Sequence, residues 1–482
     1  METKTLKQQA LSGAKWTSIE KISTQLLQFI IGVIVARLVT PSDFGIVGML
    51  AIFIAFGNAL LDSGFGTALI RQKDKDEKDY STVFFFNIAV GFVIYIFLFF
   101  SAPLIADFYQ TPILSDVTQV YGLILLINSF IVVQVAKLTA ELRFKIQFII
   151  NSLALGISGV VGIAMAYNGF GVWAIVWQQL TNRLICTFLI WIFARWRPML
   201  YFSKQSFKKL FSFGSKMLIL SFIDIIYDNV YTLTIGKFYA PQFVGYYTRS
   251  QQIVNIPQHS ISQIVSKVSL PILSPYQDDN EKLLKVFEKI FRLTIFAVYP
   301  LLVGLVVLAK PLIQILLGEK WLPCVPYLQI LSFGALWVAL TLINLNLFIV
   351  KGRSDILLKL GIIKKIIGFV IVAVTIKLGM YWICFGTTIY ALCAFIINGN
   401  QTHKLLGYGI IAQLLTIMPI FIKSVIMGAI VYLVCLLTNS YVIQLIIGFL
   451  VGIIVYFGLG FIVKDKSHND FIDIITKRKN EH

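Results

Sequence analysis

The chain has 482 residues, of which 58% are hydrophobic and 13% are charged, and its formal net charge is +18. Soluble proteins carry about 25% charged residues, and a mean hydropathy of +0.83 is too high for a surface that faces water. The composition therefore excludes a water-soluble protein. The cations lie between apolar segments, so the positive charge indicates a membrane surface and not a nucleic acid partner.

Long uncharged segments recur along the chain, among them residues 83–101, 148–179 and 424–462. About 20 apolar residues cross the hydrocarbon core of a bilayer, and only helices or closed barrels satisfy their backbone there. Because the segments lack the alternation of barrel strands, the sequence predicts an all-α integral membrane protein with about fourteen transmembrane helices. In chain order, the helices are expected at residues 14–38, 44–70, 81–106, 116–138, 147–167, 171–194, 212–238, 243–271, 287–309, 324–350, 357–378, 380–402, 418–437 and 441–463.

Lysine and arginine are concentrated in alternate loops. Residues 71–75, 143–145, 195–209, 282–289, 351–353 and 477–479 are basic, whereas the alternate loops are short and hold few cations. Because basic loops remain in the cytoplasm, we expect both termini to lie there. The first apolar segment is too long for a cleaved signal peptide, so we expect it to remain as the first span.

The two halves of the chain resemble each other. Four short motifs of the first half recur in order about 200 residues later: Pro41–Gly45 at Pro241–Gly245, Pro103–Ile105 at Pro311–Ile313, Glu141–Arg143 at Lys351–Arg353, and Gly169 with Trp173 at Gly379 with Trp382. An even number of predicted spans separates the copies, so both repeats have the same orientation in the membrane. We therefore expect two parallel-repeat six-helix lobes around a central cavity, at residues 1–205 and 206–403. An amphipathic segment (404–419) and two further helices are expected within 404–463, before a cytoplasmic tail at 464–482.

Polar side chains form a stripe on equivalent spans of both halves. The stripe comprises Glu20, Thr24 and Gln28, then Asn58 and Asp62, and in the second half Asp224 and Asp228. Since a charge at the bilayer centre costs about 2.5–3.5 kcal/mol, these residues are candidates for the lining of a cavity. Two carboxylates one turn apart disfavour double ionisation, which makes Asp224 and Asp228 candidate ion-coupling residues. Pairing with a neighbouring cation is the alternative.

The predicted span at 243–271 is the most polar one. Its candidate cavity residues are Arg249, Gln252, Asn255, His259, Gln263 and Lys267, and Arg183 of the sixth span is added to them. Guanidinium and ammonium groups suit phosphate, and amides suit sugar hydroxyls because they both donate and accept hydrogen bonds. Hydrogen bonds between helices and cations that reach the membrane surface are the alternative explanation. The five cysteines and four histidines lack the spacing of metal ligands, so no metal or cofactor is expected.

Several motifs carry a resemblance to a known family. They are Ser12–Trp16, Ala36–Gly45, Asp62–Gly66, Asn168–Trp173, Phe213 with Gly214, and Tyr246–Arg249. With them the chain resembles the Wzx-type polysaccharide flippases of the multidrug/oligosaccharidyl-lipid/polysaccharide exporter superfamily. The resemblance implies lobes like those of MATE and MurJ transporters, and a cargo of undecaprenyl-pyrophosphate-linked oligosaccharide. It also implies flipping to the outer leaflet of a bacterial inner membrane, driven by an ion gradient or the membrane potential.

The implied pathway is the synthesis of O-antigen, capsule or another surface polysaccharide. Membrane lipids and other polysaccharide-assembly proteins are the expected partners, and the chain is expected to act as a monomer. A drug or cation antiporter of the same superfamily is the first alternative, although the cations of the span at 243–271 disfavour it. A membrane enzyme is the second, and the small outer loops disfavour catalytic groups on that side.

Overall fold

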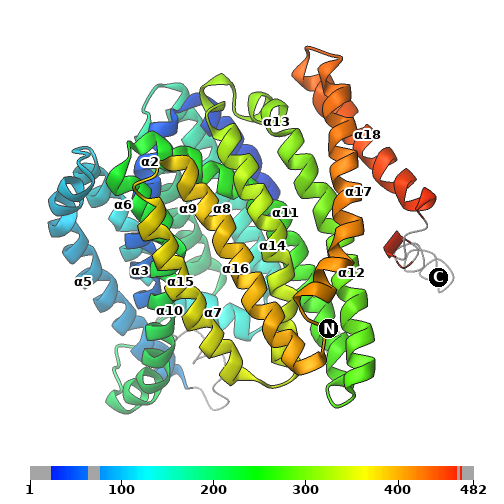
Figure 1. The fold of residues 1–482 in the computed structure, drawn as a ribbon. Coiled ribbons are helices and arrows are strands. Elements are labelled where there is room, and N and C mark those ends of the chain that lie inside the picture. Colours follow the sequence, from blue (N-terminus) through cyan, green and yellow to red (C-terminus); the bar gives the residue numbers. More distant parts are fainter. Residues whose placement is uncertain (1–22, 63–75, 464–466, 469, 471–482) are drawn as a thin grey trace, which may run out of the picture. The chain divides into compact units, whose positions relative to one another are not determined.

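The computed structural model describes residues 23–62, 76–463, 467, 468 and 470, without the side chains of 205–206, 209–217, 220 and 259–268. All regular structure in these residues is helical (Figure 1). The chain divides into two compact units, Met1–Gly245 and Tyr246–His482. The predicted lobe boundary at 205/206 follows the sequence repeat and stays a prediction.

The first unit is built from long helices that pack in pairs. They are the helix Ser23–Leu38, α2 (Pro41–Met49), α3 (Ala51–Asp62), α5 (Glu77–Tyr109), α6 (Leu114–Ser129), α7 (Val132–Ala140), α8 (Phe144–Tyr167), α9 (Val172–Phe193) and α10 (Lys204–Phe238). Within this unit α5 packs along α6, α8 along α9, and α10 against α3 and α5. Helix α11 (Pro241–Leu273) begins at the end of this unit and continues into the second.

The second unit contains the remaining helices. They are most of α11, then α12 (Asn280–Val307), α13 (Ala309–Leu316), α14 (Cys324–Val350), α15 (Ser354–Thr375), α16 (Met380–Leu406), α17 (Ile410–Leu436) and α18 (Tyr441–Ile462). Helix α14 packs along α16 and α12, and α12 also packs against α17. Helices α17 and α18 lie side by side, in orange and red in Figure 1.

The start of α2 shows why its sequence begins a helix there. Thr40 is the N-cap, and its hydroxyl oxygen accepts a hydrogen bond from the Asp43 backbone N–H at 3.2 Å. The Asp43 carboxylate accepts from the Thr40 backbone N–H at 2.9 Å, which completes a capping box. Pro41 occupies the first helical turn, where a missing backbone N–H costs nothing.

The repeated Pro–Gly motifs pack directly against each other within the first unit. A Cβ atom added to Gly45 would lie 1.7 Å from the Pro241 carbonyl oxygen, and one added to Gly245 would lie 2.0 Å from that of Pro41. Only glycine allows this reciprocal approach of two backbones. The contact relates the two motifs as a symmetric pair.

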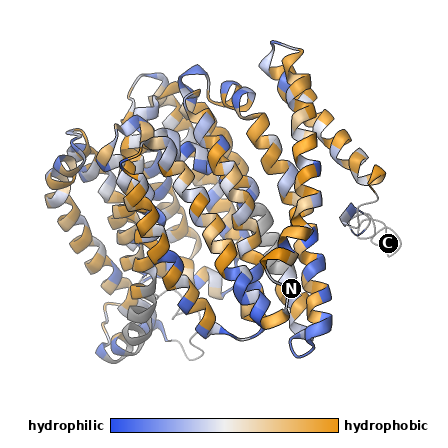
Figure 2. Ribbon diagram, in the orientation of Figure 1, coloured by the Kyte–Doolittle hydropathy of each residue, from blue (hydrophilic) through white to orange (hydrophobic). Residues whose placement is uncertain are grey.

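Hydrophobic residues predominate along most helices, which are largely orange in Figure 2, and many large hydrophobic side chains are exposed. Phe97 and Phe100 on α5, Val160 on α8 and Leu433 on α17 are examples of exposed residues of this kind. A water-soluble protein rarely exposes such continuous apolar surface. These helices therefore face lipid, and the chain is a multi-pass membrane protein.

Eight helical segments in the described part are long and apolar enough to cross a bilayer, or up to nine if α6 and α7 form one bent span. The predicted spans at 171–194, 212–238, 243–271 and 357–378 fall on α9, α10, α11 and α15, which have 22 to 35 residues but carry more polar side chains. The all-α membrane fold class is confirmed. The number of fourteen spans stays a prediction.

Candidate functional site

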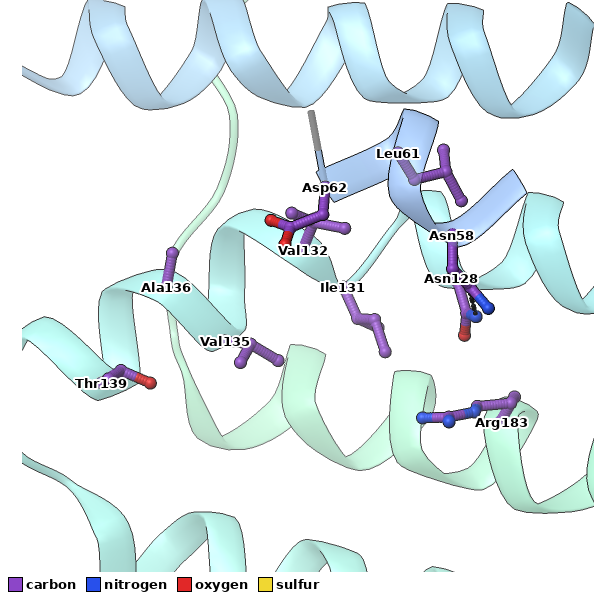
Figure 3. Close-up of a pocket in the computed structure, with 10 residues that line it drawn as sticks. All are labelled: Asn58, Leu61, Asp62, Asn128, Ile131, Val132, Val135, Ala136, Thr139 and Arg183. Carbon is purple, nitrogen blue, oxygen red and sulfur yellow. Dashed lines mark hydrogen bonds between the residues drawn. The ribbon is translucent and has the colours of Figure 1, made fainter. Parts of the chain in front are cut away.

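An open pocket of about 410 Å³ lies between helices of the first unit (Figure 3). Its lining combines charged, amide and aliphatic side chains from α3, α6, α7 and α9 and from the turn between α6 and α7. The lining residues are Asn58, Leu61, Asp62, Asn128, Ile131, Val132, Val135, Ala136, Thr139 and Arg183. We call it the N-unit pocket. Three of these residues, Asn58, Asp62 and Arg183, are candidates from the sequence.

The pocket forms where one membrane span is broken. Helices α6 and α7 meet at an angle of 40° around Phe130 and Ile131. A break leaves backbone carbonyls without their helical donors, and these carbonyls need other partners inside a membrane. The Trp191 indole N–H donates to the Phe130 carbonyl at 3.0 Å and satisfies one of them. The bend therefore opens space beside Ile131 and Val132 without leaving this carbonyl unpaired.

Two amides form one wall of the pocket. The Asn128 Nδ2 on α6 donates to the Asn58 Oδ1 on α3 at 2.9 Å. The Asn128 Oδ1 is buried and accepts no hydrogen bond from any described residue. Leaving a buried carbonyl oxygen unsatisfied costs about 1–3 kcal/mol. This oxygen is therefore an unsatisfied acceptor buried in the pocket wall.

A carboxylate and a guanidinium group face the same space. Asp62 ends α3 and Arg183 lies in the middle of α9, and both side chains are exposed. Figure 3 shows Arg183 extending from α9 into the pocket, across from Asn58 and Asp62 on α3. The arrangement offers donors, acceptors and both signs of charge beside the aliphatic side chains Val132 and Val135. Such a lining can bind polyhydroxylated groups through their hydroxyls and their C–H faces.

Further polar residues of α9 form hydrogen bonds with neighbouring helices. The Tyr121 hydroxyl donates to the Gln179 Oε1 at 2.6 Å, and the Asn182 Nδ2 donates to the Ser158 hydroxyl at 3.3 Å. These bonds tie α9 to α6 and α8. They hold α9, the helix that carries Arg183, against these two neighbours.

The other predicted stripe residues of the first unit lie outside this pocket. Thr24 is half-buried and Gln28 is exposed on the helix Ser23–Leu38, while Asp224 and Asp228 are exposed on α10. Glu20 lies outside the described residues. The structure thus brings Asn58, Asp62 and Arg183 together, and the roles of the rest stay predictions.

The predicted polar residues of α11 belong to the second unit. Arg249 donates to the Gln252 Oε1 at 2.7 Å, one turn further along the helix, and Asn255 is half-buried. His259, Gln263 and Lys267 lie on the helical backbone of α11, but their side chains are outside the described part. Their contact with a cargo remains a prediction.

Sequence reasoning missed a buried polar row in the second unit. It comprises Lys364 on α15, Asn398 and Thr402 on α16, Asn344 on α14 and Gln413 on α17, all at most 9% exposed. A charge inside the predicted span at 357–378 was the available signal for Lys364. Single amides within apolar segments carry little signal, because most of them only join neighbouring helices.

Comparison with known proteins agrees with this architecture. Residues 34–326 match the model of a family described as "Polysaccharide biosynthesis protein". The teichuronic acid biosynthesis protein TuaB of Bacillus subtilis (strain 168) is 29% identical over 354 residues, which cover 72% of both chains. The lipopolysaccharide biosynthesis protein WzxC of Escherichia coli (strain K12) is 26% identical over 401 residues, covering 82% of this chain and 80% of the relative.

Solved structures show the same fold. The lipid II flippase MurJ in an inward closed conformation has a TM-score of 0.74 and 16% identity, covering 93% of this chain and 99% of that chain. An inward-facing multidrug resistance MATE family transporter of the MOP superfamily has a TM-score of 0.58 and 16% identity, covering 82% of this chain and 94% of that chain. Together with the sequence relatives, these similarities confirm the resemblance indicated by the motifs and the predicted MATE- and MurJ-like fold class.

Proposed function

Because the chain belongs to the polysaccharide biosynthesis protein family, we propose that it flips a lipid-linked oligosaccharide from the inner to the outer leaflet of a bacterial plasma membrane. The N-unit pocket is the observation that carries this proposal. A sugar headgroup needs hydrogen-bonding partners while it is out of water. The pocket supplies them inside a helix bundle whose outer surface is apolar.

The chemistry of the pocket suits a sugar better than a hydrophobic drug. The exposed Asp62 carboxylate can accept hydrogen bonds from sugar hydroxyls, and the exposed Arg183 guanidinium can donate to them. Aliphatic side chains such as Val135 can pack against the C–H face of a sugar ring. We propose that one or more sugar residues of the cargo occupy this pocket during transport.

The cargo also carries charge that the membrane potential can act on. In this proposal its pyrophosphate is negative and moves away from an inside-negative cytoplasm. Such a potential favours outward movement by about 2.3 kcal/mol per charge per 100 mV. The basic loops face the cytoplasm in this scheme, as do both termini. Flipping then needs no hydrolysis of ATP.

Deletion of the gene tests the proposal. The cells should lose the surface polysaccharide and accumulate its lipid-linked precursor, with the sugars facing the cytoplasm. Sugar exposure is measured by adding a sugar-oxidising or lectin probe to spheroplasts, with lysed spheroplasts as the control for total precursor. If the precursor of the deletion strain is accessible from outside, the flippase proposal is wrong.

A drug or cation antiporter is the second candidate, because the fold is shared with a multidrug transporter. Asp62 is the observation in its favour, since a carboxylate in the pocket attracts a cationic drug. Arg183 in the same pocket opposes such a ligand. Cells without the gene should then gain sensitivity to cationic dyes and keep their surface polysaccharide.

A further inference from the structure

Lys364 is a cationic side chain in the middle of α15, the helix on which the predicted span at 357–378 falls. It lies halfway along the 22-residue helix α15 and is 9% exposed. At 1.5 Å per residue, either end of the helix is about 15 Å away, which is more than a lysine side chain can span. Lys364 therefore cannot place its ammonium group at the membrane surface.

A neutral amide is the hydrogen-bond partner of Lys364. Its Nζ donates to the Asn398 Oδ1 of α16 at 3.2 Å, and no carboxylate pairs with it within the described residues. A charge at this depth costs about 2.5–3.5 kcal/mol unless it is compensated. That cost falls on the ammonium form and not on the neutral amine. The site therefore distinguishes strongly between the two protonation states.

Titratable groups on the helices packed around Lys364 do not supply a negative charge that would compensate its ammonium group. Helices α14 and α16 pack against α15. The titratable residues on these three helices are Cys324 and Tyr327 on α14, Asp355, Lys359 and Lys365 on α15, and Tyr381, Cys384, Tyr390, Cys393, His403 and Lys404 on α16. None of them is hydrogen-bonded or ion-paired to Lys364 in the described part of the chain.

A row of buried polar groups continues from Asn398 towards the turn between α16 and α17. The Thr402 hydroxyl lies 3.1 Å from the Asn398 carbonyl and 2.7 Å from the Asn344 Oδ1. Asn344 and Gln413 then exchange hydrogen bonds of 3.1 and 3.2 Å. Asn398, Thr402, Asn344 and Gln413 are each 0% exposed. The row joins α14, α16 and α17 and leads from the middle of the bilayer to the helix ends.

We propose that Lys364 takes up and releases one proton in each transport cycle and so couples the proposed flipping to a proton gradient. In the uptake step, the neutral amine of Lys364 takes a proton from water and becomes an ammonium. In the release step, the ammonium returns this proton to water. A change in water access between two transport states shifts the amine between its two forms. The coupling rests on the proposed function, whereas the titration of Lys364 does not.

The titration is tested on the purified full chain in detergent. Trp337 is a natural reporter, since its ring lies 5.6 Å from that of Phe395 and its carbonyl accepts from the Thr341 hydroxyl. The Thr341 carbonyl in turn accepts from Asn398. The contribution of Trp337 to the fluorescence is the difference between the unsubstituted protein and Trp337→Phe. This contribution should change with pH. Lys364→Gln should abolish the change, because glutamine still donates to Asn398 but does not titrate.

Lys359→Gln is the matched control, since Lys359 is exposed on the same helix. It should leave the pH-dependent change intact. If the change persists in Lys364→Gln, or is absent from the unsubstituted protein, the proposal is wrong.

The coupling is tested in the deletion strain. Lys364→Gln should insert normally and lose the surface polysaccharide, whereas Lys359→Gln should restore it. Full restoration by Lys364→Gln would mean that Lys364 is only a hydrogen-bond donor, and would overturn the coupling. A deletion strain whose precursor already faces outwards would instead refute the proposed function.

Discussion

At the scale of single residues, Arg183 is a charged side chain whose place in a membrane helix needs an explanation. A guanidinium group in a membrane helix is unfavourable unless polar groups or water surround it. The N-unit pocket provides such surroundings through Asn58, Asp62 and Asn128. Arginine is also the side chain whose fixed donor geometry best matches oxygen-rich ligands. Its position in the pocket is therefore the basis of the binding role that we propose for it.

Arg183→Ala should abolish restoration of the surface polysaccharide in the deletion strain, because the pocket loses its only guanidinium group among the lining residues. Arg183→Lys should retain part of the activity, since a lysine donates but lacks the fork geometry. Polysaccharide is measured per amount of membrane-inserted protein. Lys208→Ala, at an exposed position of α10, is the control. Full activity of Arg183→Ala would remove Arg183 from the site.

Part of the pocket lining was predictable from the polar residues in the apolar spans of the sequence. Asn58 and Asp62 were identifiable because they lie one turn apart in an apolar span, and Arg183 because a charge there is rare. Asn128 was not identifiable, since a single amide in an apolar helix usually joins two helices. Whether an amide keeps an unpaired oxygen, as Asn128 does, depends on its neighbours in space.

At the scale of elements, the backbone contacts of Gly45 and Gly245 determine how closely α2 and α11 approach each other. The Pro–Gly repeat was recognisable in the sequence, but its reciprocal packing was not. The bend between α6 and α7 left no sequence signal either, because the residues around it, Phe130 and Ile131, are neither proline nor glycine. Elements that depend on tertiary packing are therefore the ones that sequence reasoning missed.

Gly45→Ala and Gly245→Ala should each destabilise the protein by about 1–3 kcal/mol or more, because a methyl group would collide with a backbone carbonyl that cannot rotate away. The measurement is thermal unfolding in detergent, followed by size-exclusion chromatography of the soluble fraction. Gly156→Ala on α8 is the control, since no heavy atom lies within 4 Å of its added Cβ. Equal stability of all three variants would contradict the reciprocal packing.

His468 and Asp470, two of the described residues after α18, contact α18 and α12. His468 is 1% exposed and its ring lies 4.3 Å from that of Phe461, while Asp470 pairs with Arg292 at 3.5 Å and with Lys289 at 3.3 Å. A Cβ on Gly460 would lie 2.6 Å from the His468 Nδ1. Gly460 therefore makes the space in which His468 packs.

Gly460→Ala should displace His468 and raise the rate of amide hydrogen exchange at residues 467, 468 and 470, because the added methyl group occupies the place of the ring. Gly458→Ala, two residues earlier on α18, meets nothing within 4 Å and should leave the exchange rate unchanged. Identical exchange in both variants would show that the packing of His468 does not depend on Gly460.

At the scale of the whole molecule, composition and charge pattern predicted a polytopic α-helical membrane protein, and the motifs that resemble a known family predicted its MATE- and MurJ-like fold. The number of spans could not be settled in this way, because α9, α10, α11 and α15 combine membrane length with many polar residues. Those same polar residues are what a transporter needs inside its bundle. Of these four helices, α9 carries Arg183 into the N-unit pocket.

The most direct test of the central claim is reconstitution. The purified full chain is placed in vesicles of phosphatidylethanolamine and phosphatidylglycerol, with a radiolabelled lipid-linked oligosaccharide extracted from the deletion strain. We predict that the sugars in the inner leaflet become accessible to an external glycosidase, and that vesicles with Arg183→Ala behave like protein-free vesicles. Inner-leaflet sugars that stay protected in the presence of the unsubstituted protein would contradict the account.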